Sequence, residues 1–225
     1  MFQNLTFTPQ EMANITWAQL QPPAEALVKR PVTAARLPAW LLDWSDFSRL
    51  VSEVSQRRYV AFTGNTTDAI AVQQYNAFLD EIYPAAQAVE QQLKQKLLAS
   101  GLQPAGMEIP LRNMRLEADL FRPENLPLLG EELKLANEYD QIIGAQTVTW
   151  EGQELTIAQL NVLLLEPERV TRESAWRLAM ERQLADRARL NDVWQRMLAL
   201  RQQIARNAGK PHFPHVALDR RPRYR

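Results

Sequence analysis

Apolar residues recur every three or four positions along most of the chain, and this spacing predicts amphipathic helices. The first clear apolar stripe spans residues 37–54, and the second spans residues 75–97. A turn at residues 64–68 separates the two stripes and ends in Asp68, a residue typical of helix N-caps. Two long amphipathic helices joined by a short link favour an antiparallel helical hairpin.

Prolines divide this part of the chain. Residues 1–31 are expected to be irregular, with Pro22 and Pro23 as a break and a short helix at residues 24–29. Pro84 lies inside the second stripe. Because proline lacks an amide hydrogen and crowds the preceding turn, we expect a kink or a break there.

Charged residues at helical spacing mark residues 107–121 and their end: Arg112, Arg115, Glu117, Asp119 and Arg122. Such a pattern is typical of a solvated or interdomain helix surface, and the alternative is a polar cleft. Pro123 suits the first turn of the next helix, which Gly144 ends. The apolar face of that helix is expected to comprise Leu129, Leu133, Ala136, Tyr139, Ile142 and Ile143.

Residues 146–156 are rich in β-forming residues around a turn and predict a small β-hairpin. Thr156 and Gln159 then form a capping-box pair that begins a helix over residues 157–165. Residues 168–207 contain neither glycine nor proline, and a continuous helix over them would be roughly 60 Å long. A bend is expected at residues 185–189, where the apolar stripe thins. The expected buried stripe comprises Trp176, Met180, Leu184, Leu190, Val193, Trp194, Met197, Ile204 and Ala208.

These elements predict a mainly α protein made of antiparallel helical hairpins or a bundle, with one small β-hairpin and a long C-terminal helix. Residues 1–209 form the helical region, and residues 210–225 form a basic, proline-rich tail that we expect to be disordered. Seven glycines among 225 residues agree with a helical fold. No cysteine is present, which excludes a thiol nucleophile and a thiolate metal site.

The N-terminal sequence lacks the pattern of a signal peptide, and no window is apolar enough to span a membrane. We therefore expect a soluble cytoplasmic protein. The formal net charge of zero argues against a general affinity for nucleic acid or anionic membranes.

Residues that could carry chemistry are scarce. The sequence lacks His-Glu-x-x-His, the helical pair of zinc ligands with an adjacent general base, and it also lacks nucleophile-elbow, phosphate-loop and dinucleotide motifs. The two histidines, His212 and His215, have no third ligand nearby in the sequence, which favours solvated side chains over a metal site. We therefore assign no catalytic residue and no metal ligand, and leave the substrate-binding residues open.

Two tryptophans and two acidic pairs each allow a structural and a functional interpretation. Trp40 and Trp44 lie on one stripe and favour a place in the core over a ligand platform. The acidic pairs Glu117 with Asp119 and Glu131 with Glu132 are common on helix surfaces and support no acid–base assignment.

Several runs together resemble the N-terminal region of oligoendopeptidase F-like zinc metallopeptidases. They are residues 110–115 (PLRNMR), 119–127 (DLFRPENLP), 138–144 (EYDQIIG), 150–156 (WEGQELT) and 201–209 (RQQIARNAG), with Arg172, Ala175 and Trp176. The resemblance extends over most of residues 17–209. It implies a mostly helical part that covers the substrate channel of enzymes that cleave short peptides in the cytoplasm.

The resemblance also implies what this chain lacks. Family members hold one zinc ion with His-Glu-x-x-His and a downstream glutamate, and no position here corresponds to those ligands. We therefore expect this chain to hold no cofactor and to be inactive alone. After Gly209 the sequence departs from the family, which suggests either a truncation with an out-of-frame tail or a separate N-terminal subunit.

Three functions remain open at this point. The first is the N-terminal part of a zinc oligopeptidase, which would act on short peptides once a catalytic domain completes it. The second is a non-enzymatic helical interaction module that forms homo-oligomers through exposed apolar faces. The third, nucleic-acid binding by the basic tail, is disfavoured because five basic residues give only weak, salt-sensitive affinity.

Overall fold

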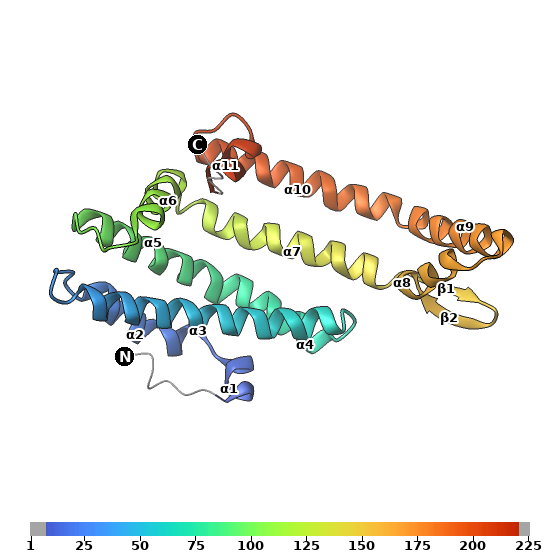
Figure 1. Ribbon diagram of the computed structural model, residues 1–225, viewed down its shortest axis with the longest axis horizontal. Coiled ribbons are helices and arrows are strands. Elements are labelled where there is room, and N and C mark those ends of the chain that lie inside the picture. Colours follow the sequence, from blue (N-terminus) through green and yellow to red (C-terminus); the bar gives the residue numbers. More distant parts are fainter. Residues whose placement is uncertain (1–7, 221–225) are drawn as a thin grey trace.

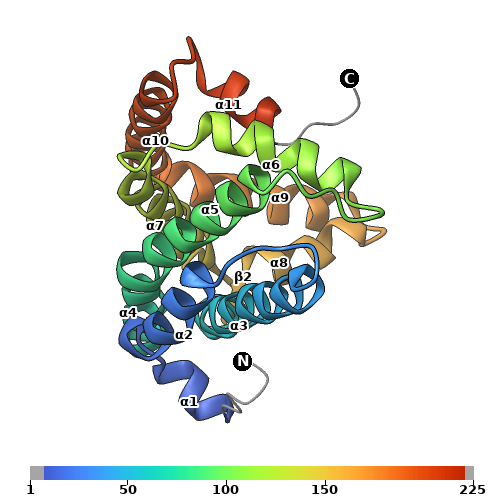
Figure 2. The same cartoon turned by 90° about the vertical axis from the view of Figure 1, so that its left-hand side faces the viewer.

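The computed structural model describes residues 8–220 and shows a mainly α protein with one two-stranded antiparallel sheet. Four long helices run along the molecule in alternating directions: α3 (Leu37–Gly64), α5 (Tyr83–Ala99), α7 (Asn125–Gly144) and α10 (Arg187–Asn207) (Figure 1). In the end-on view, α6 (Glu108–Leu120) crosses one end of this array (Figure 2). The predicted fold class is confirmed. No helix within residues 8–220 is long and apolar enough to cross a membrane.

The first 31 residues are more ordered than predicted. Within the described part, α1 covers Pro9–Asn14 and α2 covers Trp17–Lys29. The break expected at Pro22 and Pro23 is wrong, because both prolines lie inside α2. Leu20 and Leu27 flank the prolines and are fully buried. Their burial, worth about 1.5–3 kcal/mol each, offsets the roughly 3 kcal/mol cost of a proline in a helix interior.

The predicted hairpin of α3 and the following helix is present, and Pro84 explains its irregular turn. Asp68 caps α4 (Ala69–Ala77) by accepting hydrogen bonds from two backbone amides. A π-helical turn, η2 (Phe78–Ile82), separates α4 from α5, and the Tyr83 amide donates to the Phe78 carbonyl. Pro84 then lies at the start of α5. The wider turn accommodates the proline ring without ending the helical path.

Helix α7 begins later than expected and packs closely on η2. Pro123 precedes the helix instead of lying in its first turn. The side chain of Asn125, the first residue, donates to the Ile204 carbonyl at 3.1 Å and so joins α7 to the end of α10. At Gly130, a Cβ atom would lie 2.9 Å from the Leu79 carbonyl oxygen. The close approach of α7 to η2 therefore depends on glycine at this position.

The predicted β-hairpin comprises β1 (Thr147–Trp150) and β2 (Gln153–Thr156), with Thr147 opposite Thr156. The turn residues Glu151 and Gly152 both have positive φ angles, 49° and 81°. This is the backbone of the type I′ turn that suits two-residue hairpins. The capping box of Thr156 and Gln159 begins α8 (Ile157–Leu160), and the 3₁₀ helix η3 (Asn161–Leu165) follows.

The long C-terminal helix is divided where the apolar stripe thins. Helix α9 (Arg169–Ala185) ends one residue before Asp186, and α10 follows (Figure 1). The expected buried stripe is only partly correct. Val193, Ile204 and Ala208 are buried, but three of its members are exposed to solvent: Trp176, Leu184 and Trp194. On α7, Tyr139 and Ile143 are likewise exposed.

The tail also differs from the expectation of disorder. Residues 213–220 form α11 (Phe213–Arg220), which packs against α6 and α10. Val216 is buried in a cluster with Leu120 and Ile204, which explains why this short segment is helical. Residues 221–225 lie outside the described residues.

Candidate functional site

The histidines do not form a metal centre with other described residues. The rings of His212 and His215 lie 6.1 Å apart between centroids, and both residues are exposed. Within residues 8–220, no three His, Cys, Asp or Glu side chains come together in a way that could hold a metal ion. Two imidazoles alone do not supply the three protein ligands of a catalytic zinc site.

Trp40 and Trp44 belong to the core, as predicted. Both are buried, their rings meet edge to face with centroids 5.2 Å apart, and their indole nitrogens donate to the Leu27 carbonyl and to Glu90. Their burial supports a place in the core.

The charged residues of segment 107–121 lie partly on the solvated surface and partly at the edge of a cavity. Arg112, Arg115 and Asp119 on α6 are exposed, as a solvated surface requires. Glu117 instead turns toward α5 and pairs with Lys94 at 2.6 Å. The acidic pair Glu131 and Glu132 on α7 is engaged in ion pairs with Lys134 and Arg201, so neither residue is a free carboxylate.

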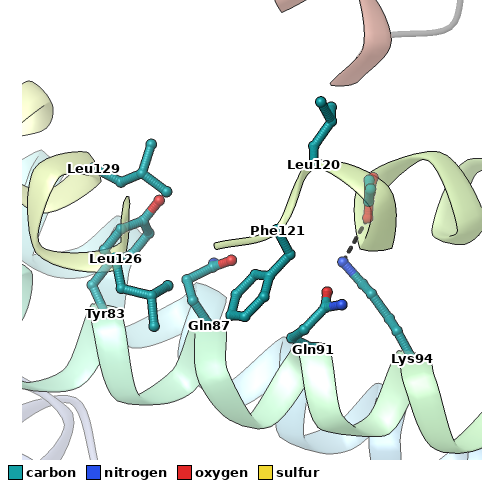
Figure 3. A pocket seen from close by; sticks show the side chains of 9 residues that line it. Tyr83, Gln87, Gln91, Lys94, Leu120, Phe121, Leu126 and Leu129 are labelled. Carbon is teal, nitrogen blue, oxygen red and sulfur yellow. Dashed lines mark hydrogen bonds and ion pairs between the residues drawn. The ribbon is translucent and has the colours of Figure 1, made fainter. Parts of the chain in front are cut away.

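The Lys94–Glu117 pair borders a pocket of about 320 Å³ between α5, α6 and α7 (Figure 3). Polar side chains rise from α5, whereas the end of α6, its link to α7 and α7 itself contribute mostly apolar side chains. The lining residues are Tyr83, Gln87, Gln91, Lys94, Glu117, Leu120, Phe121, Leu126 and Leu129. We call this cavity the α5–α7 pocket.

Gln91 is the most unusual member of this lining. The residue is only 5% exposed, and its Nε2 atom has no hydrogen-bond partner among the described residues. One turn earlier on α5, Gln87 is half-buried and also lines the pocket. The charges of Lys94 and Glu117 neutralise each other. The lining therefore combines carboxamides, one ion pair and apolar side chains.

A second surface lies on α9 and α10. The exposed large apolar side chains include Trp176 at 51% and Trp194 at 59%, with Leu184 and Leu198. Trp176 and Leu184 lie on α9, and Trp194 and Leu198 lie on α10. We call these four residues the α9–α10 apolar stripe.

Sequence reasoning missed both features for the same reason. Gln87 and Gln91 occur one turn apart within an apolar segment, and only this spacing could have indicated a polar face. Trp176 and Trp194 fit a helical stripe, but periodicity does not show which stripe of a helix another element covers.

The family model described as Peptidase M3 N-terminal domain matches residues 7–108. The predicted resemblance is confirmed by this match. No curated protein matches the chain.

Solved structures resemble nearly the whole chain in fold. A protein described as an oligoendopeptidase F superposes with a TM-score of 0.86 at 20% identity, over 99% of this chain and 40% of the other. A structure of PZ peptidase A with an inhibitor superposes with a TM-score of 0.82 at 19% identity. The match covers 100% of this chain and 40% of the other. A protein described as an oligoendopeptidase F from Bacillus anthracis superposes with a TM-score of 0.83 at 15% identity. The match covers 99% of this chain and 42% of the other.

Two facts follow from these superpositions. The likeness of fold to these two structures covers 99% and 100% of this chain. The chain spans about 40% of the length of the structures that it matches.

Proposed function

We propose that this chain supplies the N-terminal, channel-covering part of a zinc metallopeptidase that cleaves short peptides. The observation that carries the proposal is the superposition of 99% of this chain on an oligoendopeptidase F fold, together with the M3 domain match. The array of α3, α5, α7 and α10 provides an extended wall (Figure 1). A cytoplasmic location belongs to the same proposal.

Catalysis then requires a second part that holds the zinc ion. The residues of this chain do not fit that role, because the exposed histidine pair has no third ligand among the described side chains. The α9–α10 apolar stripe supports such a division, since a second part packing on it would remove two exposed tryptophans from water. This chain alone is therefore expected to be inactive.

A quenched fluorescent peptide assay tests this proposal. The purified chain is expected to show no hydrolysis, with or without added zinc. Co-expression with the polypeptide encoded directly downstream, if that polypeptide carries His-Glu-x-x-His, is expected to give hydrolysis that a chelator abolishes. Chelator-sensitive cleavage by the pure chain alone would refute the claim of inactivity. A soluble complex that contains zinc and cleaves no peptide would refute the peptidase role.

The second candidate function is a non-enzymatic interaction module, and the α9–α10 apolar stripe favours it as well. The two candidates differ in what covers the stripe. A stable homo-oligomer in light scattering, which persists when the downstream polypeptide is present, would favour the module. Displacement of the homo-oligomer by that polypeptide would favour the peptidase part.

A further inference from the structure

A second cavity, of about 440 Å³, lies between α3, α5 and α6. Helix α5 packs against both other helices and lies between them in the end-on view (Figure 2). The volume falls within the range of small-molecule sites. We call this space the α3–α6 cavity. The lining residues are Leu41, Trp44, Ser45, Ser48, Glu90, Lys94, Met107 and Met114.

Glu90 on α5 supplies the carboxylate of this lining. The residue is half-buried, and its two oxygens accept hydrogen bonds from Trp44 Nε1, at 2.7 Å, and from the Ser48 hydroxyl. Both donors are neutral, so they orient the carboxylate without balancing its charge. A carboxylate can accept about four hydrogen bonds, and these two leave acceptor positions for a ligand.

The cation of the lining is engaged elsewhere. Lys94 follows Glu90 by four positions, a spacing at which helical residues often form an ion pair. Its Nζ atom instead contacts Glu117 Oε2 on α6 at 2.6 Å. Among the described residues, Glu90 has no ion-pair partner. Glu90, Lys94 and Glu117 therefore carry one net negative charge, and a bound cation would offset the cost of holding the Glu90 charge away from water.

The rest of the lining selects the kind of cation. Leu41, Met107 and Met114 give the cavity an apolar side. A hydrated metal ion would place water against these side chains, and one carboxylate does not supply the several oxygen ligands that Mg²⁺ and Ca²⁺ require. An alkylammonium ion has three N–H donors for the carboxylate and methylene groups for the apolar side.

We propose that the α3–α6 cavity binds an alkylammonium ion, with its charged head on Glu90 and its chain against Leu41, Met107 and Met114. The assignment goes beyond the proposed function, because this site needs no zinc ion and takes no part in peptide cleavage. The same head and chain occur in a free alkylamine and in a lysine side chain of a polypeptide, so the experiment compares these two sources.

The test is an NMR titration of the full chain with n-pentylamine at pH 7, where an alkylamine is charged. The indole N–H signal of Trp44 is the reporter, because this group donates to Glu90. We expect this signal to shift and to saturate. n-Pentanol, which has the same chain without the charge, is expected to bind at least about ten-fold more weakly.

A parallel titration with Nα-acetyl-lysine methylamide distinguishes the two sources. Tighter binding of this compound than of n-pentylamine would assign the site to a lysine side chain of a polypeptide. Tighter binding of n-pentylamine would assign it to a free amine.

Glu90→Gln removes the charge and keeps the size of the side chain, and we expect it to weaken n-pentylamine binding at least about ten-fold. Glu108→Gln is the matched control. Glu108 is an exposed carboxylate on α6 that does not line the cavity, so this variant is expected to bind as the unaltered chain does.

A second pair of variants leaves Glu90 and its two hydrogen-bond donors in place. Ser45 is exposed on α3 and lines the cavity. Ser45→Lys adds a competing cation and is expected to weaken binding at least about five-fold relative to Ser45→Gln, which adds a side chain of similar length without the charge. Absence of a saturable Trp44 shift, equal binding of n-pentanol, or equal affinities within both pairs of variants would overturn the proposal.

Discussion

Two pairs of tryptophans on helices have opposite environments. Trp40 and Trp44 on α3 are 0% and 7% exposed, whereas Trp176 on α9 and Trp194 on α10 are 51% and 59% exposed. Both pairs fit a helical repeat in the sequence. The difference therefore does not come from the pattern of each helix, and it must come from the neighbours of each helix.

The neighbours explain the contrast. Trp40 and Trp44 lie in a cluster built from α2, α3 and α5, and their indole nitrogens are bonded to residues of α2 and α5. Helix α10 instead buries Val193 against α7. Helix α9 buries Ala175 and Ala179 against β1 and α8. Small residues on the covered face and tryptophans on the uncovered face are the opposite of the arrangement on α3. No element among residues 8–220 covers the α9–α10 apolar stripe.

The largest expected effect is at Trp40. Trp40→Ala removes a fully buried aromatic side chain and its bond to the Leu27 carbonyl, and we expect it to lower the free energy of unfolding by about 3–5 kcal/mol. Urea denaturation followed by circular dichroism measures this change. A loss below about 1 kcal/mol would show that the cluster between α2, α3 and α5 is not the stabilising core.

The same contrast shows how far the sequence predicts the fold. Helical spacing located α3, the hairpin to α5 and the turn at Asp68, because these depend on residues near one another in the chain. The helix through Pro22 and Pro23 was not predictable, since it depends on burial of Leu20 and Leu27 by distant elements. The π-helical form of the turn before Pro84 was likewise not predictable from the spacing of apolar residues.

The candidate site was less predictable than the fold. In the sequence, nothing distinguishes Glu117 from the other charged residues of α6. Only the packing of α5 against α6 places Lys94 opposite it. The missing partner of Gln91 is a property of the assembled helices, so no local pattern records it. The absence of His-Glu-x-x-His, in contrast, can be read directly from the sequence.

A smaller effect is expected where α7 meets the N-terminal helices. Gly130→Ala would place a methyl group 2.9 Å from the Leu79 carbonyl oxygen, and the backbone must shift to relieve the overlap. We expect a loss of about 1–3 kcal/mol in unfolding free energy, the usual range for an overpacked site. Thermal or urea denaturation provides the measurement.

Gly64→Ala is the control for this change. No atom lies within 4 Å of a Cβ at position 64, and the backbone there is helical. This variant is expected to be neutral or slightly more stable. Equal destabilisation by the two substitutions would indicate that the contact between α7 and η2 is not as close as the structure shows.

The junction between α9 and α10 predicts a dependence on pH. A hydrogen bond from Gln146, together with the Arg182 guanidinium, holds the pKa of Asp186 below its ordinary value against the opposing effect of burial. Because the folded chain binds this proton less readily than the unfolded chain, the stabilisation is present at neutral pH. This stabilisation begins to be lost when the pH falls below about 3.9, the ordinary pKa of aspartate. The loss is complete once the pH has fallen below the lowered pKa of Asp186 in the folded chain.

Melting temperatures measured from pH 7 to pH 3 test this expectation. Asp186→Asn is expected to melt at a lower temperature at pH 7 and to lose less stability on acidification than the unaltered chain. Asp192→Asn, at an exposed carboxylate on α10, is the matched control and is expected to keep the acid dependence of the unaltered chain. Parallel acid curves for the unaltered chain and Asp186→Asn would remove Asp186 as the origin of the effect.

The smallest effect on stability, and the most direct test of the comparison, is expected at the exposed tryptophans. Trp176→Ser with Trp194→Ser removes the two largest apolar groups of the α9–α10 stripe, and each side chain is more than half exposed. We expect each substitution to change the unfolding free energy by only about 0.5 kcal/mol or less, in contrast to Trp40→Ala. Self-association in sedimentation velocity is expected to decrease, because the apolar area that drives it is reduced. A large loss of stability without any change in association would show that Trp176 and Trp194 belong to the core of this chain and not to an interface.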